Sequence, residues 1–133
     1  NDWVCGRQYT QLDPRHPLWT GGFREGLDGE ALAPAPHVGS AYYAESLADA
    51  WRVARQASDR PRALKYRETL ERGLQFLNTL QYTEANTQHF ADWYRPVVVG
   101  AFFASHQDGN LRIDYTQHAV SALVQYLTYL TGP

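Results

Sequence analysis

The chain has 133 residues, of which 44% are hydrophobic and 20% charged, and its net charge is −2. This size and composition predict one compact domain, and scattered charges with no basic stripe argue against nucleic acid as a partner. The only cysteine, Cys5, excludes an internal disulfide, and no apolar run approaches the ~18 residues that a membrane span needs.

The N-terminal segment, residues 1–39, is rich in proline and glycine and has no sustained periodicity. It predicts a loop-rich segment with short ordered pieces. The sequence also contains no methionine, even at position 1. We therefore expect residues 1–133 to be a single helical domain that forms the C-terminal part of a longer protein.

Two helices are predicted after this segment. Tyr43, Leu47 and Trp51 recur at helical spacing, which predicts a helix over residues 41–57. Asp59 and Pro61 then mark the start of a second helix that reaches about Tyr82. The connection of three or four residues predicts an antiparallel helical hairpin.

The remaining residues predict a polar loop, a short apolar piece and a last helix. The sequence TEANTQHFADWYRP has no helical periodicity, and VVVGAFFA is β-prone but lacks obvious strand partners. The last helix is expected over residues 115–131. Its expected buried face consists of Val120, Leu123, Val124, Leu127 and Leu130. The predicted fold class is all-α.

A weak internal repeat links two parts of the chain. Gly21-Gly22-Phe23 is followed by Asp28-Gly29 and a helix, and Gly100-Ala101-Phe102 is followed by Asp108-Gly109 and a helix. This pattern resembles α/α-toroid proteins, and RGLQFLNTLQ is similar to a helix of the prenyltransferase and squalene-cyclase repeats. The resemblance implies antiparallel hairpins from an incomplete toroid, completed by the rest of the protein or by another chain. An open helical bundle is the alternative.

The segment RIDYTQH holds the first candidate site. Asp114 is expected to cap the last helix, with Gln117 as its capping-box partner. His118 lies one turn further on the same face, so Asp114 could also orient its imidazole for acid–base chemistry. Arg112, beside Tyr115, is placed to bind an anion at the helix start. A structural histidine is the competing interpretation.

The other candidates lie in two loops. In WTGGFREGLDGE, Glu25 is a candidate acid or base beside Arg24, while Trp19 and Phe23 offer stacking faces. His37, before the first long helix, occupies roughly the place that Arg112 has in the second copy of the repeat. A glycine-rich loop with surface charges explains the same residues.

The second loop contains HFADWYRP. Asp92, Trp93 and Arg95 combine an acid, a flat apolar face and a guanidinium, as sugar-binding loops do. Equally, the aromatic residues of this loop can anchor it on the core.

Carbohydrate-processing enzymes also use the α/α-toroid fold. The resemblance therefore implies, as the leading function, binding or acid–base processing of a glycan or another polar ligand. The resulting enzyme would be a hydrolase, lyase or epimerase without a cofactor, with His118, Asp114 and Glu25 as catalytic residues. A non-catalytic helical module for protein–protein interaction is one alternative. An isoprenoid-handling toroid is the other, although the acidic cyclase motif is missing.

Overall fold

The structure is a computed structural model that describes residues 1–24 and 35–131. Glu25 lies outside these residues. The helices are α1 (Asp2–Cys5), α2 (Ser40–Gln56), α3 (Arg60–Asn78), α4 (Arg95–Val98) and α5 (Ile113–Thr131), with a 3₁₀ turn at Pro17–Trp19 and a hairpin of β1 (Phe103–Ser105) and β2 (Asp108–Leu111).

Helices α2 and α3 form the predicted antiparallel hairpin. The Asp59 carboxylate accepts the backbone N–H of Arg62 at 3.2 Å, and Pro61 stands in the first turn, so α3 begins as expected. It ends at Asn78, earlier than the predicted Tyr82. The reason is tertiary, because the backbones of Leu80 and Tyr82 pair with residues 101–103.

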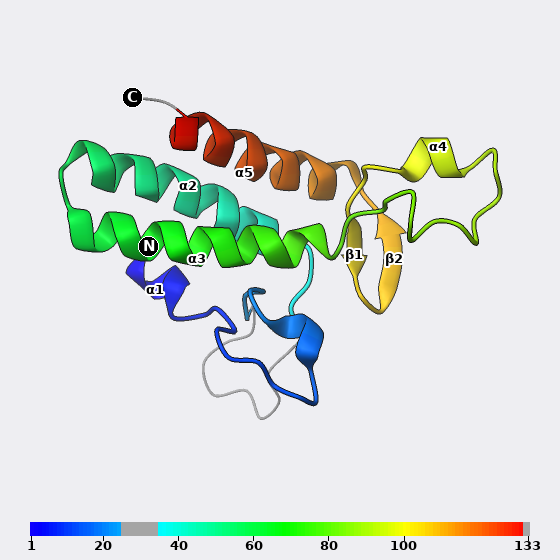
Figure 1. The fold of residues 1–133 in the computed structure, drawn as a ribbon, viewed down its shortest axis with the longest axis horizontal. Coiled ribbons are helices and arrows are strands. Elements are labelled where there is room, and N and C mark those ends of the chain that lie inside the picture. Colours follow the sequence, from blue (N-terminus) through cyan, green and yellow to red (C-terminus); the bar gives the residue numbers. More distant parts are fainter. Residues whose placement is uncertain (25–34, 132–133) are drawn as a thin grey trace.

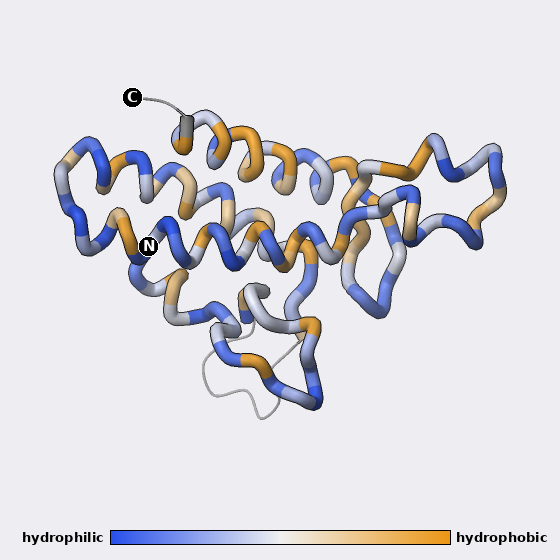
Figure 2. Tube along the Cα trace, viewed as in Figure 1, coloured by the Kyte–Doolittle hydropathy of each residue, from blue (hydrophilic) through white to orange (hydrophobic). Residues whose placement is uncertain are grey.

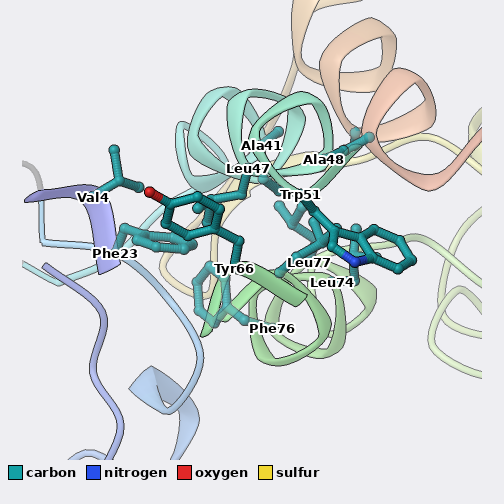
Figure 3. Close-up of a cluster of buried hydrophobic side chains, with 14 of the residues drawn as sticks. Val4, Phe23, Ala41, Leu47, Ala48, Trp51, Tyr66, Leu74, Phe76 and Leu77 are labelled. Atoms are coloured by element: carbon teal, nitrogen blue, oxygen red, sulfur yellow. The ribbon is translucent and has the colours of Figure 1, made fainter. Parts of the chain in front are cut away.

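The long helices lie in two layers. Helix α2 packs against both α3 and α5. Figure 1 shows that α2 and α5 run in the same direction, while α3 runs opposite to both. Viewed along the helices in Figure 3, α2 and α5 occupy one layer, and α3 lies below α2.

The core lies between these layers. Phe23, Leu47, Leu70 and Leu77 have no exposed surface, and Phe76 has almost none. Figure 3 shows this cluster filling the space between α2 and α3. Trp51 closes it on the α5 side, where its ring lies 5.8 Å from that of Tyr126.

The all-α prediction is correct only in its coarser form, because the fold is mainly helical but contains a small sheet. Strands β1 and β2 pair antiparallel, with Phe103 opposite Leu111 and Ser105 opposite Asp108. This hairpin connects the segment after α4 to the start of α5. None of the described helices is long and apolar enough to cross a membrane.

The predicted buried face of the last helix is wrong for most of its residues. Val120, Val124, Leu127 and Leu130 are 43–56% exposed, and only Leu123 of the predicted set is partly buried. Ala119 and Ala122 are the fully buried positions instead. The apolar pattern is real, as Figure 2 shows along α5, but small residues make the contact with the core.

The weak repeat of the sequence has a much stronger counterpart in the backbone. Gln8 forms an isolated antiparallel bridge with Phe23, and Gln81 forms the same bridge with Phe102. Phe23 and Phe102 are both 0% exposed. Each bridge therefore fixes one buried phenylalanine in the segment that precedes a parallel helix, Phe23 before α2 and Phe102 before α5.

Each bridge is closed by a glycine in a left-handed conformation. Gly21 has φ +89° and Gly100 has φ +95°. The Gln8 side-chain amide donates to the Gly21 carbonyl at 3.0 Å, and the Gln81 amide donates to the Gly100 carbonyl at 3.1 Å. The two loops are thus built on the same hydrogen bonds.

The same repetition connects each loop to its helix. The Phe23 N–H donates to the Ser40 hydroxyl at 3.1 Å, and the Phe102 N–H donates to the Thr116 hydroxyl at 3.2 Å. Ser40 and Thr116 stand in the first turns of α2 and α5. The described residues therefore contain two equivalent loop-and-helix units, and α3 separates these units along the sequence.

Candidate functional site

The main candidate site is a polar cluster where the first halves of α2 and α5 meet. Its centre is His118, whose Nδ1 lies 2.6 Å from Oε2 of Glu45. The hydroxyl of Ser121 donates to the other carboxylate oxygen of Glu45 at 2.5 Å. A carboxylate of α2 thus holds a histidine and a serine of α5.

These bonds keep Glu45 ionised. Burial alone raises the pKa of the Glu45 carboxyl, but the hydrogen bonds from Ser121 and His118 outweigh it and hold the pKa below its ordinary value. An ionised carboxylate accepts hydrogen bonds and donates none. Nδ1 of His118 therefore donates to Glu45, and in the neutral form of the ring the Nε2 lone pair is available.

A second acidic group lies one turn before His118. The Asp114 carboxylate accepts two hydrogen bonds from Arg112, at 3.0 and 2.9 Å, and one from the Tyr42 hydroxyl at 3.2 Å. Burial raises the pKa of Asp114, but these bonds outweigh it and lower the pKa overall. The Tyr42 ring also lies 4.2 Å from the His118 ring, which joins the two groups into one cluster.

The two roles predicted for Asp114 are therefore wrong. Helix α5 begins at Ile113, so Asp114 is its second residue and not its cap. The carboxylate that orients His118 comes from Glu45. Asp114 instead pairs with Arg112, whose guanidinium also lies 5.1 Å from the centre of the Tyr115 ring.

The cluster has the parts for proton transfer at an accessible surface. The side chains of Glu45, Asp114 and His118 keep 28–30% of their surface exposed, and that of Arg112 keeps 64%. An imidazole oriented by a carboxylate can take a proton from a bound hydroxyl or water. Beside it, Arg112 has N–H donors beyond the two that bind Asp114, and the Tyr42 hydroxyl oxygen can still accept a hydrogen bond.

The predicted residues of the first loop are only partly available to a ligand. Phe23 is completely buried, so the prediction that it stacks on a sugar is wrong. Trp19 is half-buried, with the His16 ring stacked 3.9 Å away, and it lines a cleft of about 280 Å³ together with His106. No interaction of Trp19 connects this cleft to His118 within the described residues.

Two further residues of that group take part in hydrogen bonds between a side chain and the backbone. The carbonyl of Arg24 accepts the Arg7 Nε–H at 2.7 Å. Nδ1 of His37 accepts the N–H of Gly39 at 3.0 Å, just before α2 begins. His37 therefore orders the backbone just before α2, whereas Arg24 contributes only its carbonyl to the bond with Arg7.

The loop before α4 is exposed. Trp93 is 78% exposed, so it does not anchor this loop on the core. Arg95 pairs with Glu84 at 2.8 Å and lies 3.8 Å from Asp92, whose side chain is fully exposed. The hydrogen bonds and ion pairs of these described residues stay within their own loop and do not reach His118.

The residues that the sequence did not single out are Tyr42, Glu45 and Ser121. Glu45 looks like an ordinary polar position of an amphipathic helix, and it is 73 residues from His118. Counting from Ser40 and Thr116, however, Glu45 and Ser121 occupy the same place in the two units. A stricter alignment of the repeat would have brought both residues to attention.

We expect Glu45→Gln to lower the free energy of unfolding by about 1 kcal/mol at pH 7, since it removes a charge-assisted hydrogen bond. The folded-state pKa of Glu45 lies below its unfolded value, so its contribution is present above the unfolded pKa of about 4.3 and lost as the pH falls through the folded pKa. Urea unfolding at pH 7 and pH 3 measures this.

The matched control is Glu68→Gln, which removes an exposed carboxylate 3.5 Å from Arg72 on α3. This change should leave stability almost unaltered at either pH. An equal loss for Glu45→Gln at pH 7 and at pH 3 would argue against the charged role of Glu45.

Comparisons with known proteins do not identify the chain, because no family model, curated protein or solved structure matches it. Among residues 1–24 and 35–131, no group of three His, Cys, Asp or Glu side chains is arranged to hold a metal ion. The function therefore has to be argued from the polar cluster itself.

Proposed function

We propose that the chain is part of an α/α toroid that binds a glycan or another polar ligand on the surface shared by α2 and α5, and that His118 transfers a proton there. The observation that carries this proposal is the Glu45–His118 bond of 2.6 Å. It holds the imidazole through Nδ1 while the side chain stays partly exposed.

The repeated unit supports the toroid part of the proposal. In such folds, helical pairs follow one another around an axis and the inner helices run parallel. Helices α2 and α5 run parallel, and each follows a loop closed by the same bridge and the same left-handed glycine. In this proposal, helix α3, which follows α2 and packs against it, is the outer helix of the pair.

The side chains around His118 support a polar ligand. Arg112 has N–H donors beyond those that bind Asp114, and the Tyr42 hydroxyl oxygen and the Asp114 carboxylate are acceptors. Hydroxyl groups of a sugar need both kinds of partner. The proton transfer proposed for Nε2 requires no cofactor, and it fits hydrolase, lyase and epimerase chemistry alike.

The second candidate function is a helical module for protein–protein interaction. The exposed apolar side chains of α5 favour it, because contiguous apolar surface of this kind marks interfaces. The two functions are compatible, since His118 and Val120 project from different flanks of the helix.

The experiment is a thermal-shift and calorimetric titration of the chain with neutral and uronic-acid oligosaccharides. A ligand at 100 times its Kd stabilises the folded state by about 2.7 kcal/mol, which raises Tm by several degrees. We expect His118→Gln and Arg112→Ala to abolish this shift and to retain the helical circular dichroism of the wild type.

The matched control is His89→Gln, which changes an exposed histidine in the loop before α4. It should leave binding intact. A glycan that binds equally well to His118→Gln and Arg112→Ala would contradict the assignment of the site, and no shift with any oligosaccharide would contradict the ligand class.

A further inference from the structure

Val120 and Val124 form an apolar ridge on α5. These side chains lie one turn apart on the same flank and are 44% and 56% exposed. Ile113, two turns before Val120, is 88% exposed and extends the ridge toward the helix start. His118 and Ser121 face α2 from another flank of the same helix.

Comparison of the two repeated units indicates which kind of element covers the ridge-bearing flank of such a helix. Ser40 of α2 and Thr116 of α5 accept equivalent hydrogen bonds and therefore occupy the same place in their units. Counting from these two residues, Val120 of α5 corresponds to Ala44 of α2. One turn later, Val124 corresponds to Ala48.

On α2 these positions are fully covered. Ala44 and Ala48 are both 0% exposed, and Ala48 is the counterpart of Val124. Figure 3 shows Ala48 at the border between α2 and α5. Helix α5, the next parallel helix, thus covers these positions of α2. The equivalent positions of α5 remain exposed.

The opposite flank of α2 faces a groove. Ser46 and Val53 line this groove of about 450 Å³ together with Ala50 and Ala57. Asn1, whose side-chain carbonyl accepts the Ser46 hydroxyl at 2.8 Å, and the charged residues Asp49, Asp59 and Arg62 line it as well. By the same counting, Ser46 corresponds to Ala122, a buried residue of α5. This flank of α2 is therefore equivalent to the flank of α5 that meets α2.

We propose that a second copy of this chain docks the Ser46 and Val53 flank of its α2 on the Val120 and Val124 ridge of α5. The second α2 then lies against α5 as α5 lies against the first α2. The chain supplies both halves of this contact, a ridge and a groove. The contact is head-to-tail, so further copies form a ring or a filament.

The same placement enlarges the polar surface. Tyr42 of the first copy lies against His118. Since Tyr42 and His118 occupy equivalent places in the two units, Tyr42 of the second copy comes beside His118 from the other side. The inference shares the repeat with the proposed function but not its ligand chemistry, so either can fail alone.

The test is a disulfide between two different variants in a Cys5→Ser background. Val124→Cys and Ser46→Cys are prepared separately, because these positions correspond to Ala48 and Ala122, which are both buried in the core shared by α2 and α5. On mild oxidation, a mixture of Val124→Cys and Ser46→Cys should give a disulfide-linked mixed dimer. Its yield should be at least ten times that of the mixed dimer from Val124→Cys and Leu64→Cys, the control pair. Leu64 is 60% exposed and lies on α3.

Sedimentation equilibrium supplies the second measurement. The mass of the unmodified chain should rise with concentration between 10 and 500 µM, while Val124→Asp stays monomeric with unchanged circular dichroism. The proposal is overturned by a chain that stays monomeric and yields no excess of mixed dimer. It is equally overturned if Val124→Cys dimerises mainly with itself.

Discussion

Phe23→Ala and Phe102→Ala should each lower the free energy of unfolding by about 3–5 kcal/mol. Both rings are 0% exposed, and each belongs to the bridge that precedes a long helix. Truncation loses the burial of the ring and leaves a cavity that a close-packed core fills only in part. Urea unfolding followed by circular dichroism measures both changes.

The comparison between the two variants tests the repeat itself. Because Phe23 and Phe102 hold equivalent places, their effects should be of similar size. Trp93→Ala is the control, since Trp93 is 78% exposed and its removal should cost less than about 0.5 kcal/mol. A Phe102→Ala variant as stable as Trp93→Ala would show that the second unit is not built like the first.

Gly21→Ala should cost about 2–5 kcal/mol, whereas Gly100→Ala should cost about 1–2 kcal/mol. Both glycines have positive φ, so alanine is strained at either position. At Gly21 an added Cβ would also lie 2.3 Å from the carbonyl oxygen of Arg72 in α3, while at Gly100 it would meet nothing within 4 Å. The difference measures the contact between the first loop and α3.

The measurement is thermal and urea unfolding of both glycine variants under the same conditions. A smaller loss for Gly21→Ala than for Gly100→Ala would mean that the first loop does not approach α3 as closely as described. Equal losses would mean that backbone strain alone decides the outcome.

The helical framework could be predicted from the sequence because it depends on local signals. Leu47 and Trp51 recur at helical spacing, and both are buried as expected. Asp59 caps α3 as its position before Pro61 predicted. Such features need only neighbouring residues, so a single sequence is enough to find them.

The errors arose where distant residues decide the outcome. Asp114 has the spacing of a helix cap, but α5 begins one residue before it. The Asp114 carboxylate instead accepts hydrogen bonds from Arg112. Val120 and Val124 carry the apolar spacing of a core face, yet the described helices leave them exposed. Spacing identifies an apolar face but does not say which element covers it.

The site could be predicted in part. His118 was identified from its place near the start of the last helix, but its partner Glu45 comes from another helix. The repeated tripeptide Gln-Tyr-Thr, at residues 8–10 and 81–83, would have given a firmer alignment of the two units. That alignment leads directly to the bridges of Gln8 and Gln81.

The most direct test of the central claim is the tautomer of His118, measured by long-range ¹H–¹⁵N NMR at a pH where the imidazole is neutral. The bond to Glu45 predicts a proton on Nδ1 and a bare Nε2, and the Nε2–H form should gain population in Glu45→Gln. A wild-type His118 protonated on Nε2 would contradict the account, because Glu45 would then not hold the ring and Nε2 could not accept a proton.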